Sequence, residues 1–385
     1  MQLAQAGHGA ESRTCPAIKT LLIVGPQPPP IGGSPLTVQA IIAELVRYPS
    51  IRVEVINTSP LRDVRKKMTG FNLEKVRRML LIVSEYLQRV RSCSAVLVFA
   101  NDLFTFTLVP VLLLLAHSFH KSFYIKPVGG SLDLYLAAQK KPFRKYLLNV
   151  LRSADGVLAQ TQLLQAALTR LGCAKTYYLP GCRPPLQITR LPDRTREGLR
   201  LIFLAHITRD KGPLVLLEAL QLLALRCTAE VNCDFYGPIH DEIREEFQRQ
   251  LAATPNACYC GVAEAEAGSR LIAAYDALVL PTSFDAEGHP GVLIEAMHAA
   301  VPVISTQFRA IPELVTHGDN GLLVPVHDSQ ALADAIKQLA LDHSLRQRMG
   351  QANYRRGHEF RSDVVVAQIL KIIFPGETHE SSFLT

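Results

Sequence analysis

The stretch PTSFDAEGHPGVLIEAM, residues 281–297, decides the fold. It follows an apolar run over residues 275–280 that is typical of a buried strand, and from Pro290 onward its apolar pattern predicts a helix. Glu287 therefore lies in the loop, and Glu295 lies near the second helical turn, facing that loop. The sequence predicts a strand, a loop and a helix that bring two carboxylates together.

The start of this predicted helix suits an anion. First-turn N–H groups have no intrahelical partner and carry the positive end of the helix dipole. The backbone of His289, Gly291 and Val292, around Pro290, is therefore expected to donate hydrogen bonds to a diphosphate. Gly288 and Gly291 let such a ligand approach closely.

The two glutamates have the chemistry to bind hydroxyl groups. A carboxylate accepts hydrogen bonds at two oxygens, so Glu295 suits the paired hydroxyls of a ribose, and Glu287 suits hydroxyls of an attached sugar. Two glutamates at this spacing are by themselves most often a loop acid and a solvated helix residue. The residues flanking them favour the binding interpretation.

The stretch resembles the E-x7-E motif of the retaining glycosyltransferases of family 4. Blocks at residues 299–306 (AAVPVIST), 311–315 (IPELV) and 317–325 (HGDNGLLVP) continue the resemblance. It implies the GT-B fold, an α/β architecture of two Rossmann-like domains with parallel sheets facing an interdomain cleft. Ala300 stands where the family usually has glycine, at a helix end where a positive φ is expected.

A second block, AHITRDKG at residues 205–212, resembles the diphosphate-binding G-R-L-x3-K-G block of the family. Lys211 falls on the family's lysine, His206 occupies the usual arginine position, and Arg209 is a nearby cation that could substitute for it. Histidine carries only partial positive charge near neutral pH. We therefore expect Arg209 and Lys211 to neutralise the leaving diphosphate. Together with Glu287 they are the candidate catalytic residues, and His206 is expected to bind the donor. Solvated charges before a helix are the plain alternative.

Two glycine segments of the first half are expected to face this site. Gly32 and Gly33 follow an apolar strand over residues 21–24 and precede a helix over 36–48. Paired glycines most often only make a turn, but in the family the glycine loop after the first strand faces the diphosphate and the acceptor. The resemblance thus assigns Gly32 and Gly33 to the donor side.

The segment KPVGGSLD, residues 126–133, stands where many family members carry a histidine close to the reacting sugar. No histidine occurs in it. The resemblance implies that backbone and hydroxyl groups of the Gly-Gly-Ser stretch replace that histidine, with a lysine or an aspartate assisting. The candidate acceptor-side residues are Lys126, Gly129, Gly130, Ser131 and Asp133.

Length and element order predict two domains. The chain has 385 residues, a length that exceeds what a single hydrophobic core usually supports. Its residues are 48% apolar and 19% charged, which leaves enough apolar side chains for two cores. Strand candidates alternate with helical segments, so parallel sheets with crossovers are expected. The expected organisation is a flexible tail over 1–17, an acceptor-side domain over 18–190, a nucleotide-sugar domain over 195–360, and over 361–385 a helix that crosses back to the first domain, followed by a tail.

The sequence shows no targeting signal or zinc motif. Residues 1–17 lack the basic start and apolar stretch of a signal peptide, and the apolar window over 108–116 is too short to span a bilayer. The eight cysteines form no CxxC pair and have no histidine at zinc-finger spacing. We therefore expect reduced thiols and a cytoplasmic protein.

Charge is divided unevenly between the two halves. Lys and Arg minus Asp and Glu give 26 − 11 = +15 for residues 1–199 and 15 − 23 = −8 for residues 200–385. Basic clusters at 62–67, 75–78 and 140–145 suit an anionic membrane surface or a phosphorylated acceptor. The helix predicted over 73–90 reads equally well as a basic amphipathic membrane helix or as a packed surface helix with solvated charges. No aromatic-rich stacking motif accompanies the clusters, so a nucleic-acid partner is not expected.

The resemblance implies a particular reaction. No Asp-x-Asp triplet occurs, so the metal-bridged diphosphate of the other common glycosyltransferase fold lacks its ligands. We expect a retaining, metal-independent hexosyltransferase without a cofactor. It would move a sugar from a UDP- or GDP-sugar to a hydroxyl of a glycan or lipid-linked acceptor in polysaccharide or glycoconjugate biosynthesis, peripherally on the cytoplasmic face of the membrane. Alternatives are a catalytically silent relative that binds nucleotide sugar or membrane, a sugar-nucleotide epimerase of the same fold, and a nucleic-acid binder.

Overall fold

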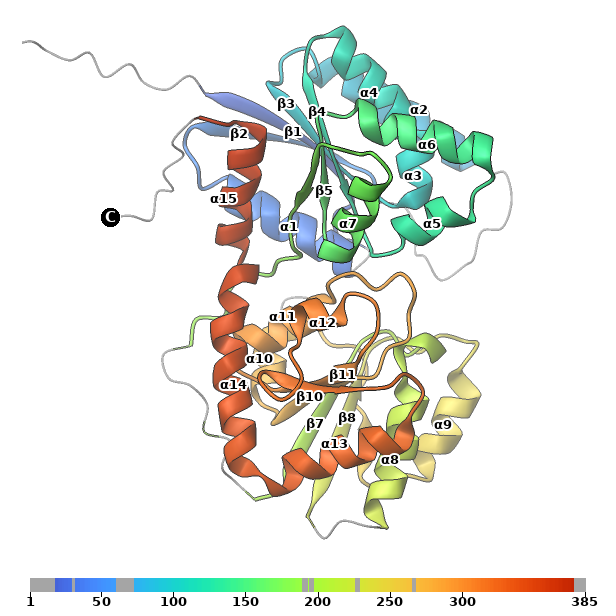
Figure 1. Ribbon diagram of the computed structural model, residues 1–385, viewed down its shortest axis with the longest axis vertical. Helices are drawn as coiled ribbons and strands as arrows, with labels where there is room; N and C mark the ends of the chain where they lie inside the picture. The colour runs from blue at the N-terminus through green and yellow to red at the C-terminus, as the bar shows by residue number, and fades with distance from the viewer. Residues whose placement is uncertain are drawn as a thin grey trace, which may run out of the picture.

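The computed structural model contains two α/β domains, one above the other in Figure 1, each built on a six-stranded sheet. It describes residues 18–29, 32–59, 73–188, 193, 197–225, 229–264 and 268–376. All paired strands within the two sheets are parallel. The expected α/β class with two parallel sheets is confirmed. The predicted tail over 1–17 and the basic cluster at 62–67 lie outside the described residues.

The first sheet has the strand order β2-β1-β3-β4-β5-β6. Its strands are β1 (Lys19–Gly25), β2 (Ile51–Asn57), β3 (Ala95–Ala100), β4 (Ser122–Pro127), β5 (Gly156–Ala159) and β6 (Thr176–Tyr178). Its helices are α1 (Gly33–Leu45), α2 (Leu73–Arg89), α3 (Asp102–Thr107), α4 (Val109–Ser118), α5 (Leu132–Ala138), α6 (Lys141–Ser153) and α7 (Gln162–Arg170). β3 is buried along its whole length, because helices cover both faces of the sheet, as is usual for parallel strands.

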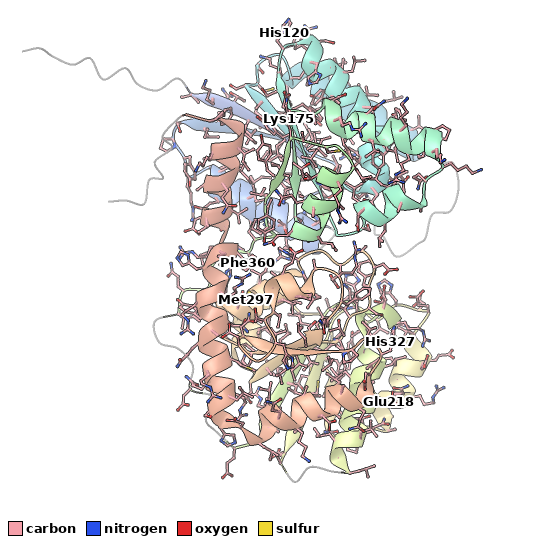
Figure 2. The ribbon with its side chains drawn as sticks, in the orientation of Figure 1. His120, Lys175, Glu218, Met297, His327 and Phe360 are labelled. Atoms are coloured by element: carbon pink, nitrogen blue, oxygen red, sulfur yellow. The ribbon has the colours of Figure 1, made fainter. Side chains whose placement is uncertain are left out.

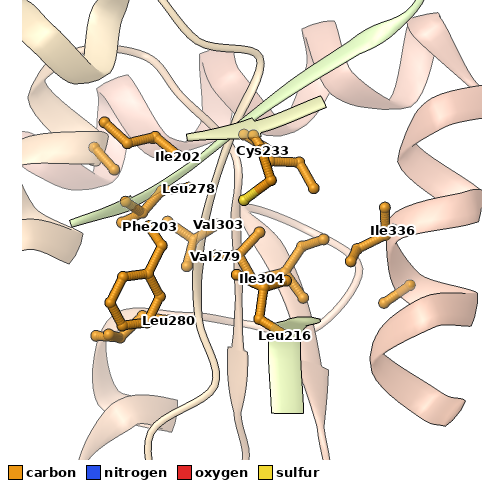
Figure 3. Close-up of a cluster of buried hydrophobic side chains, with 14 of the residues drawn as sticks. Ile202, Phe203, Leu216, Cys233, Leu278, Val279, Leu280, Val303, Ile304 and Ile336 are labelled. Atoms are coloured by element: carbon orange, nitrogen blue, oxygen red, sulfur yellow. The ribbon is translucent and has the colours of Figure 1, made fainter. Parts of the chain in front are cut away.

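The second sheet has the order β12-β11-β10-β7-β8-β9. Its strands are β7 (Leu199–Leu204), β8 (Val231–Tyr236), β9 (Ala257–Tyr259), β10 (Ala277–Leu280), β11 (Val303–Thr306) and β12 (Gly321–Val324). Its helical segments are η1 (Arg209–Lys211), α8 (Pro213–Ala224), α9 (Arg244–Ala252), α10 (Gly268–Ala273), α11 (Gly291–His298), α12 (Ile311–Leu314), α13 (Ser329–Leu341) and α14 (His343–Gly357). Figure 3 shows part of its core, where Val279 and Ile304 from the central strands lie near Leu216 of α8 and Ile336 of α13.

The chain passes between the domains twice, and the two crossings lie together. After α14, a short turn η2 (His358–Phe360) leads into α15 (Ser362–Ile373). Val366 and Ile369 of α15 pack with Val38 and Ile41 of α1 in the first domain (Figure 1). The other crossing follows β6, where Arg183 accepts a backbone hydrogen bond from Ser362 at 3.0 Å and donates one to Phe360 at 3.1 Å. Figure 2 labels Phe360 where the two domains meet.

Two segments singled out in the first half have structural contacts. The apolar window over 108–116 forms most of α4, whose Leu112 and Ala116 are fully buried. In α2, Arg78 and Arg89 donate to backbone carbonyls of β2, at 2.7 and 2.9 Å. Within the described part of the chain, no helix has the length and apolar character needed to cross a membrane.

Candidate active site

The loop after β10 fixes the first motif glutamate. Glu287 is buried, and its Oε2 accepts a hydrogen bond from the Thr282 hydroxyl at 3.0 Å. The same hydroxyl accepts the backbone N–H of Phe284 at 3.1 Å, which closes the start of the loop. Pro290 is the N-cap residue of α11, which begins at Gly291, one residue after the helix start expected from the sequence. The carboxylate is therefore held by the loop itself.

Lys211 meets Glu287 directly. Its Nζ lies 2.5 Å from Glu287 Oε2 and 4.5 Å from the centre of the Phe284 ring. Gly212 makes this approach feasible, because its φ is +79° and a Cβ there would run into the Pro281 carbonyl. The structure thus brings together one cation and one carboxylate from the two motif blocks.

The second motif glutamate has a partner that the motifs did not reveal. Glu295 Oε1 accepts a hydrogen bond from Arg183 Nε at 2.8 Å, and the two side chains are only 13% and 7% exposed. The guanidinium covers Gly291 so closely that a Cβ there would overlap it. A cation therefore lies over the N-terminus of α11, where the helix dipole favours an anion.

Arg183 also connects this helix to the glycine loop of the first domain. Its Nη1 donates to the Thr37 hydroxyl at 2.7 Å, and its Nη2 donates to the Gly33 carbonyl at 3.4 Å. Gly33 is the first residue of α1, and Gly32 before it is extended at φ −175°. The structure thus places Gly32 and Gly33 beside the Arg183–Glu295 pair.

The other two predicted cations point elsewhere. Arg209 pairs with Glu246 of α9 at 2.5 Å, and its side chain is 63% exposed. His206 Nδ1 lies 3.0 Å from His240 Nε2. Burial lowers the pKa of the His206 imidazole, and His240 and Lys211 lower it further. His206 therefore adds little positive charge near neutral pH, and Lys211 is the predicted cation that contacts Glu287.

The Gly-Gly-Ser segment lies against the Glu287 loop. Gly130 donates its backbone N–H to the Ala286 carbonyl at 2.8 Å, and a Cβ on Gly130 would overlap the Glu287 carbonyl. Gly129 precedes it at φ +88°. Ser131 donates its hydroxyl to Asp102 at 2.8 Å. Glycine at position 130 is thus required for the two domains to meet here.

The remaining acceptor-side candidates make structural contacts. Asp133 pairs with Arg309 of the second domain at 2.7 Å, and Arg309 also donates to the Gly130 carbonyl. Lys126 is buried in β4 and donates to the Leu179 carbonyl at 2.8 Å. Burial lowers the pKa of Lys126 to about 8. In this structure Asp133 holds the domains together, and Lys126 is hydrogen-bonded within its own domain.

His289 belongs to the domain contact rather than to the loop surface. Its Nδ1 lies 3.4 Å from the backbone nitrogen of Gly181, and its Nε2 lies 3.2 Å from Glu313. Glu313 also accepts the N–H groups of Gln162 and Leu163, at 2.7 and 2.8 Å, at the start of α7. A neutral imidazole that accepts from Gly181 and donates to Glu313 satisfies every partner. The His289 side chain is thereby occupied, and its backbone stays at the α11 N-terminus.

Around this helix start, small residues leave space for backbone contact. A Cβ on Gly288 would lie 2.9 Å from Gln160 Oε1 of the first domain. Val292 is partly buried and packs against the core of the second domain. Backbone groups of the loop and of the first turn therefore lie between the two charged pairs.

The segment that carries this site is similar to a known protein family. Residues 198–342 match the family model "Glycosyl transferases group 1". The match lies within the second domain, and the resemblance drawn from the sequence motifs is confirmed there. The family model covers both Lys211 and the two motif glutamates.

Among curated relatives, the chain is 28% identical over 237 residues to the putative colanic acid biosynthesis glycosyltransferase WcaL of Salmonella typhimurium, covering 58% of this chain and 57% of that protein. It is 29% identical over 200 residues to the amylovoran biosynthesis glycosyltransferase AmsK of Erwinia amylovora, covering 48% and 47%. The chain thus spans about half the length of the curated relatives it matches.

Solved structures confirm the fold. Anabaena HepE, crystallised in complex with UDP and glucose, superposes with a TM-score of 0.67 at 17% identity, covering 92% of this chain and 98% of that one. At this identity the likeness concerns the fold alone. The architecture is GT-B, as expected from the motifs.

Proposed function

We propose that this chain is a retaining glycosyltransferase that transfers a sugar from a UDP- or GDP-sugar to a hydroxyl of a glycan or lipid-linked acceptor. The observation that carries the proposal is the pairing of Lys211 with Glu287 and of Arg183 with Glu295 on either side of the α11 N-terminus. The names of WcaL and AmsK support a role in polysaccharide biosynthesis. The UDP and glucose bound to HepE support a nucleotide-sugar donor.

In the proposed complex the donor separates the charged pairs. The ribose hydroxyls bind Glu295, the diphosphate binds the first-turn N–H groups of α11 and Lys211, and hydroxyls of the sugar bind Glu287. Arg183, released from Glu295, then faces the diphosphate. The cations that compensate the motif glutamates in the free protein thus become the cations that compensate the leaving group.

The reaction follows from these positions. The acceptor oxygen bonds to the anomeric carbon on the face from which the nucleoside diphosphate departs, and the carbon–oxygen bond to the phosphate breaks. The acceptor proton passes to the leaving phosphate oxygen, so configuration is retained. Catalysis consists of positioning and of stabilising the charge that develops on the diphosphate. Side chains and helix dipoles supply this stabilisation, so the reaction is proposed to need no metal.

Two isosteric variants test the proposal. Glu287→Gln is expected to lower kcat about 100-fold, because Glu287 contacts the reacting sugar. Glu295→Gln is expected to act mainly through a higher KM for the donor, because Glu295 contacts the ribose. Initial rates of nucleoside-diphosphate release at varied donor concentration separate these effects. Wild-type kcat in folded Glu287→Gln would contradict the assignment.

A catalytically silent nucleotide-sugar or membrane-binding relative remains the second candidate. His206 in place of arginine favours it, because a neutral imidazole contributes little to a diphosphate site. This candidate predicts donor binding by calorimetry without turnover under any acceptor. Turnover that is lost in Glu287→Gln excludes it.

We further propose that the first domain contacts an anionic membrane. Its helices carry large exposed apolar side chains, and α6 carries basic residues. Figure 1 shows α2, α4 and α6 together on one side of the first domain. The exposed apolar side chains include Leu80 and Leu81 of α2, Leu103 of α3, Leu114 of α4, and Phe143 and Tyr146 of α6. The pattern is that of an interfacial surface, in which apolar groups enter the headgroup region and cations meet anionic lipid.

Vesicle co-sedimentation tests this contact. Leu114→Ser with Phe143→Ser is expected to reduce binding to phosphatidylglycerol vesicles, while Leu225→Ser retains it. Leu225 is an apt control because it is 84% exposed but lies in the other domain. Equal binding of both variants would place the contact elsewhere.

A further inference from the structure

A cluster of potential metal ligands lies on the edge of the second sheet. β8 and β9 pair in parallel with Asp234 opposite Cys258. Cys260 lies two residues further along, so its side chain is on the same face of the sheet. The side-chain ligand atoms of Asp234, Cys258 and Cys260 all lie within 4.8 Å of one another.

The exposure of these thiols needs an explanation. Free cysteine usually behaves as a small buried hydrophobe, and Cys93, Cys173, Cys182 and Cys233 are buried in this way. Cys258 and Cys260 are exposed, so packing does not account for them. They converge on a carboxylate instead.

The carboxylate is held in place by an aromatic neighbour. Tyr275 follows α10 and is 3% exposed, and its hydroxyl donates to Asp234 Oδ2 at 2.7 Å. The Tyr236 hydroxyl lies 3.2 Å from that of Tyr275. Oriented carboxylates of this kind are typical of metal sites, where a second group fixes the ligand.

We propose that Asp234, Cys258 and Cys260 bind a thiophilic divalent cation of the Zn²⁺ type. Two thiolates and one carboxylate oxygen are ligands that zinc accepts, and water completes the tetrahedron. No zinc spacing is recognisable in the sequence, because the third ligand comes from a different strand. The cation would fasten the three-residue edge strand β9 to β8.

This site is separate from the proposed donor site. β9 and β10 are three strand spacings apart in the sheet, which corresponds to roughly 14 Å. The cation therefore does not bridge a diphosphate bound at Glu287. Its presence is compatible with metal-independent transfer.

Cobalt binding tests the proposal directly. The full chain, reduced and freed of metal, is titrated with Co²⁺ under anaerobic conditions. A thiolate-to-cobalt charge-transfer band is expected in the near ultraviolet, and equimolar Zn²⁺ is expected to abolish it. Zn²⁺ should also raise the Tm of the chain, because a ligand of the native state stabilises it.

Variants assign the band to its ligands. Cys258→Ser with Cys260→Ser is expected to lose the band and the rise in Tm, and Tyr275→Phe to weaken Co²⁺ affinity about 10-fold. Cys93→Ser, in the other domain, should keep both. Absence of the band in the wild type, or its persistence in the double variant with native circular dichroism, would overturn the proposal.

Discussion

At the scale of single residues, the two motif glutamates differ in their partners. Glu287 is bound by Lys211 and Thr282, both close to a recognisable motif, whereas Glu295 is bound by Arg183 from the interdomain crossing. The motifs assigned Lys211 and Glu287 to one site without predicting that they pair, and they did not include Arg183. Arg183 belongs to no pattern in the sequence, and only the return of the chain after β6 brings it to α11.

The Arg183–Glu295 pair is expected to matter for stability. Arg183→Ala leaves a nearly buried carboxylate without its cation, which costs about 3 kcal/mol in comparable pairs. The expected result is a clearly lower urea midpoint, measured by circular dichroism. Arg209→Ala removes an exposed pair and is expected to leave the midpoint unchanged. A similar decrease of the urea midpoint in both variants would mean that the buried Arg183–Glu295 pair stabilises the fold no more than an exposed pair does.

Ala300 departs from the family motif but keeps the backbone conformation expected at this position. It follows α11 with φ +53°, the left-handed conformation expected for a residue that usually is glycine in the family. An alanine methyl group is the smallest side chain that meets this strain. The helix end is therefore retained although the glycine is replaced.

At the scale of elements, the Gly-Gly-Ser segment and the Glu287 loop form one contact. Gly130→Ala is expected to push the loop away and to lower kcat about 100-fold, because displacement by about 1 Å can have that effect on positioned groups. Gly156→Ala is the control, since a Cβ there is also crowded, at 2.9 Å from Tyr124, but Gly156 begins β5 at the end of the sheet opposite the loops of the site. The measurement is kcat of both variants by nucleoside-diphosphate release. A wild-type kcat in Gly130→Ala would show that the contact does not position Glu287.

Apolar runs predicted most of the elements that carry the site. Strands expected over 21–24 and 275–280 correspond to β1 and β10. Such strands can be predicted from the sequence because a strand covered on both faces is apolar along its whole length. The contacts of Glu313 with α7 and of Arg309 with Asp133 were not predictable, because they join residues more than a hundred positions apart. The Asp234–Cys258–Cys260 cluster was missed for another reason: Asp234 belongs to β8 and Cys258 to β9, and only the pairing of these two strands brings them together.

At the scale of the whole molecule, the two domains meet through charged and polar contacts. His289 with Glu313, Asp133 with Arg309, and Arg183 with Glu295 and Thr37 all lie at this boundary. Hydrogen bonds from His289 and from the backbone of α7 hold the pKa of Glu313 below its usual value, although burial opposes them. Polar interfaces of this kind are compatible with domain motion during donor entry.

The histidine in this boundary predicts a pH dependence. Burial holds the pKa of His289 below its ordinary value of 6.5, so the neutral form is favoured on folding. The stability that this contributes is present above the ordinary pKa and is lost as the pH falls toward the folded pKa. The urea midpoint is therefore expected to decrease between about pH 7.5 and about pH 5.5.

His206 and His298 also have lowered pKa values and contribute with the same sign. His289→Gln removes one of the three titrations while its amide still donates to Glu313, so the decrease should become smaller. His327→Gln, at an exposed position, should keep the full decrease. An identical pH dependence in all three proteins would refute the assignment to His289.

The central claim is that the α11 N-terminus and its two glutamates act on a nucleotide sugar without a metal. The most direct measurement is nucleoside-diphosphate release from a panel of UDP-, GDP- and ADP-sugars in EDTA, with Glu287→Gln as the control. The account predicts release from one UDP- or GDP-sugar that EDTA does not reduce and that the variant loses. Release that requires added Mg²⁺ or Mn²⁺, or that persists undiminished in the variant, would contradict it.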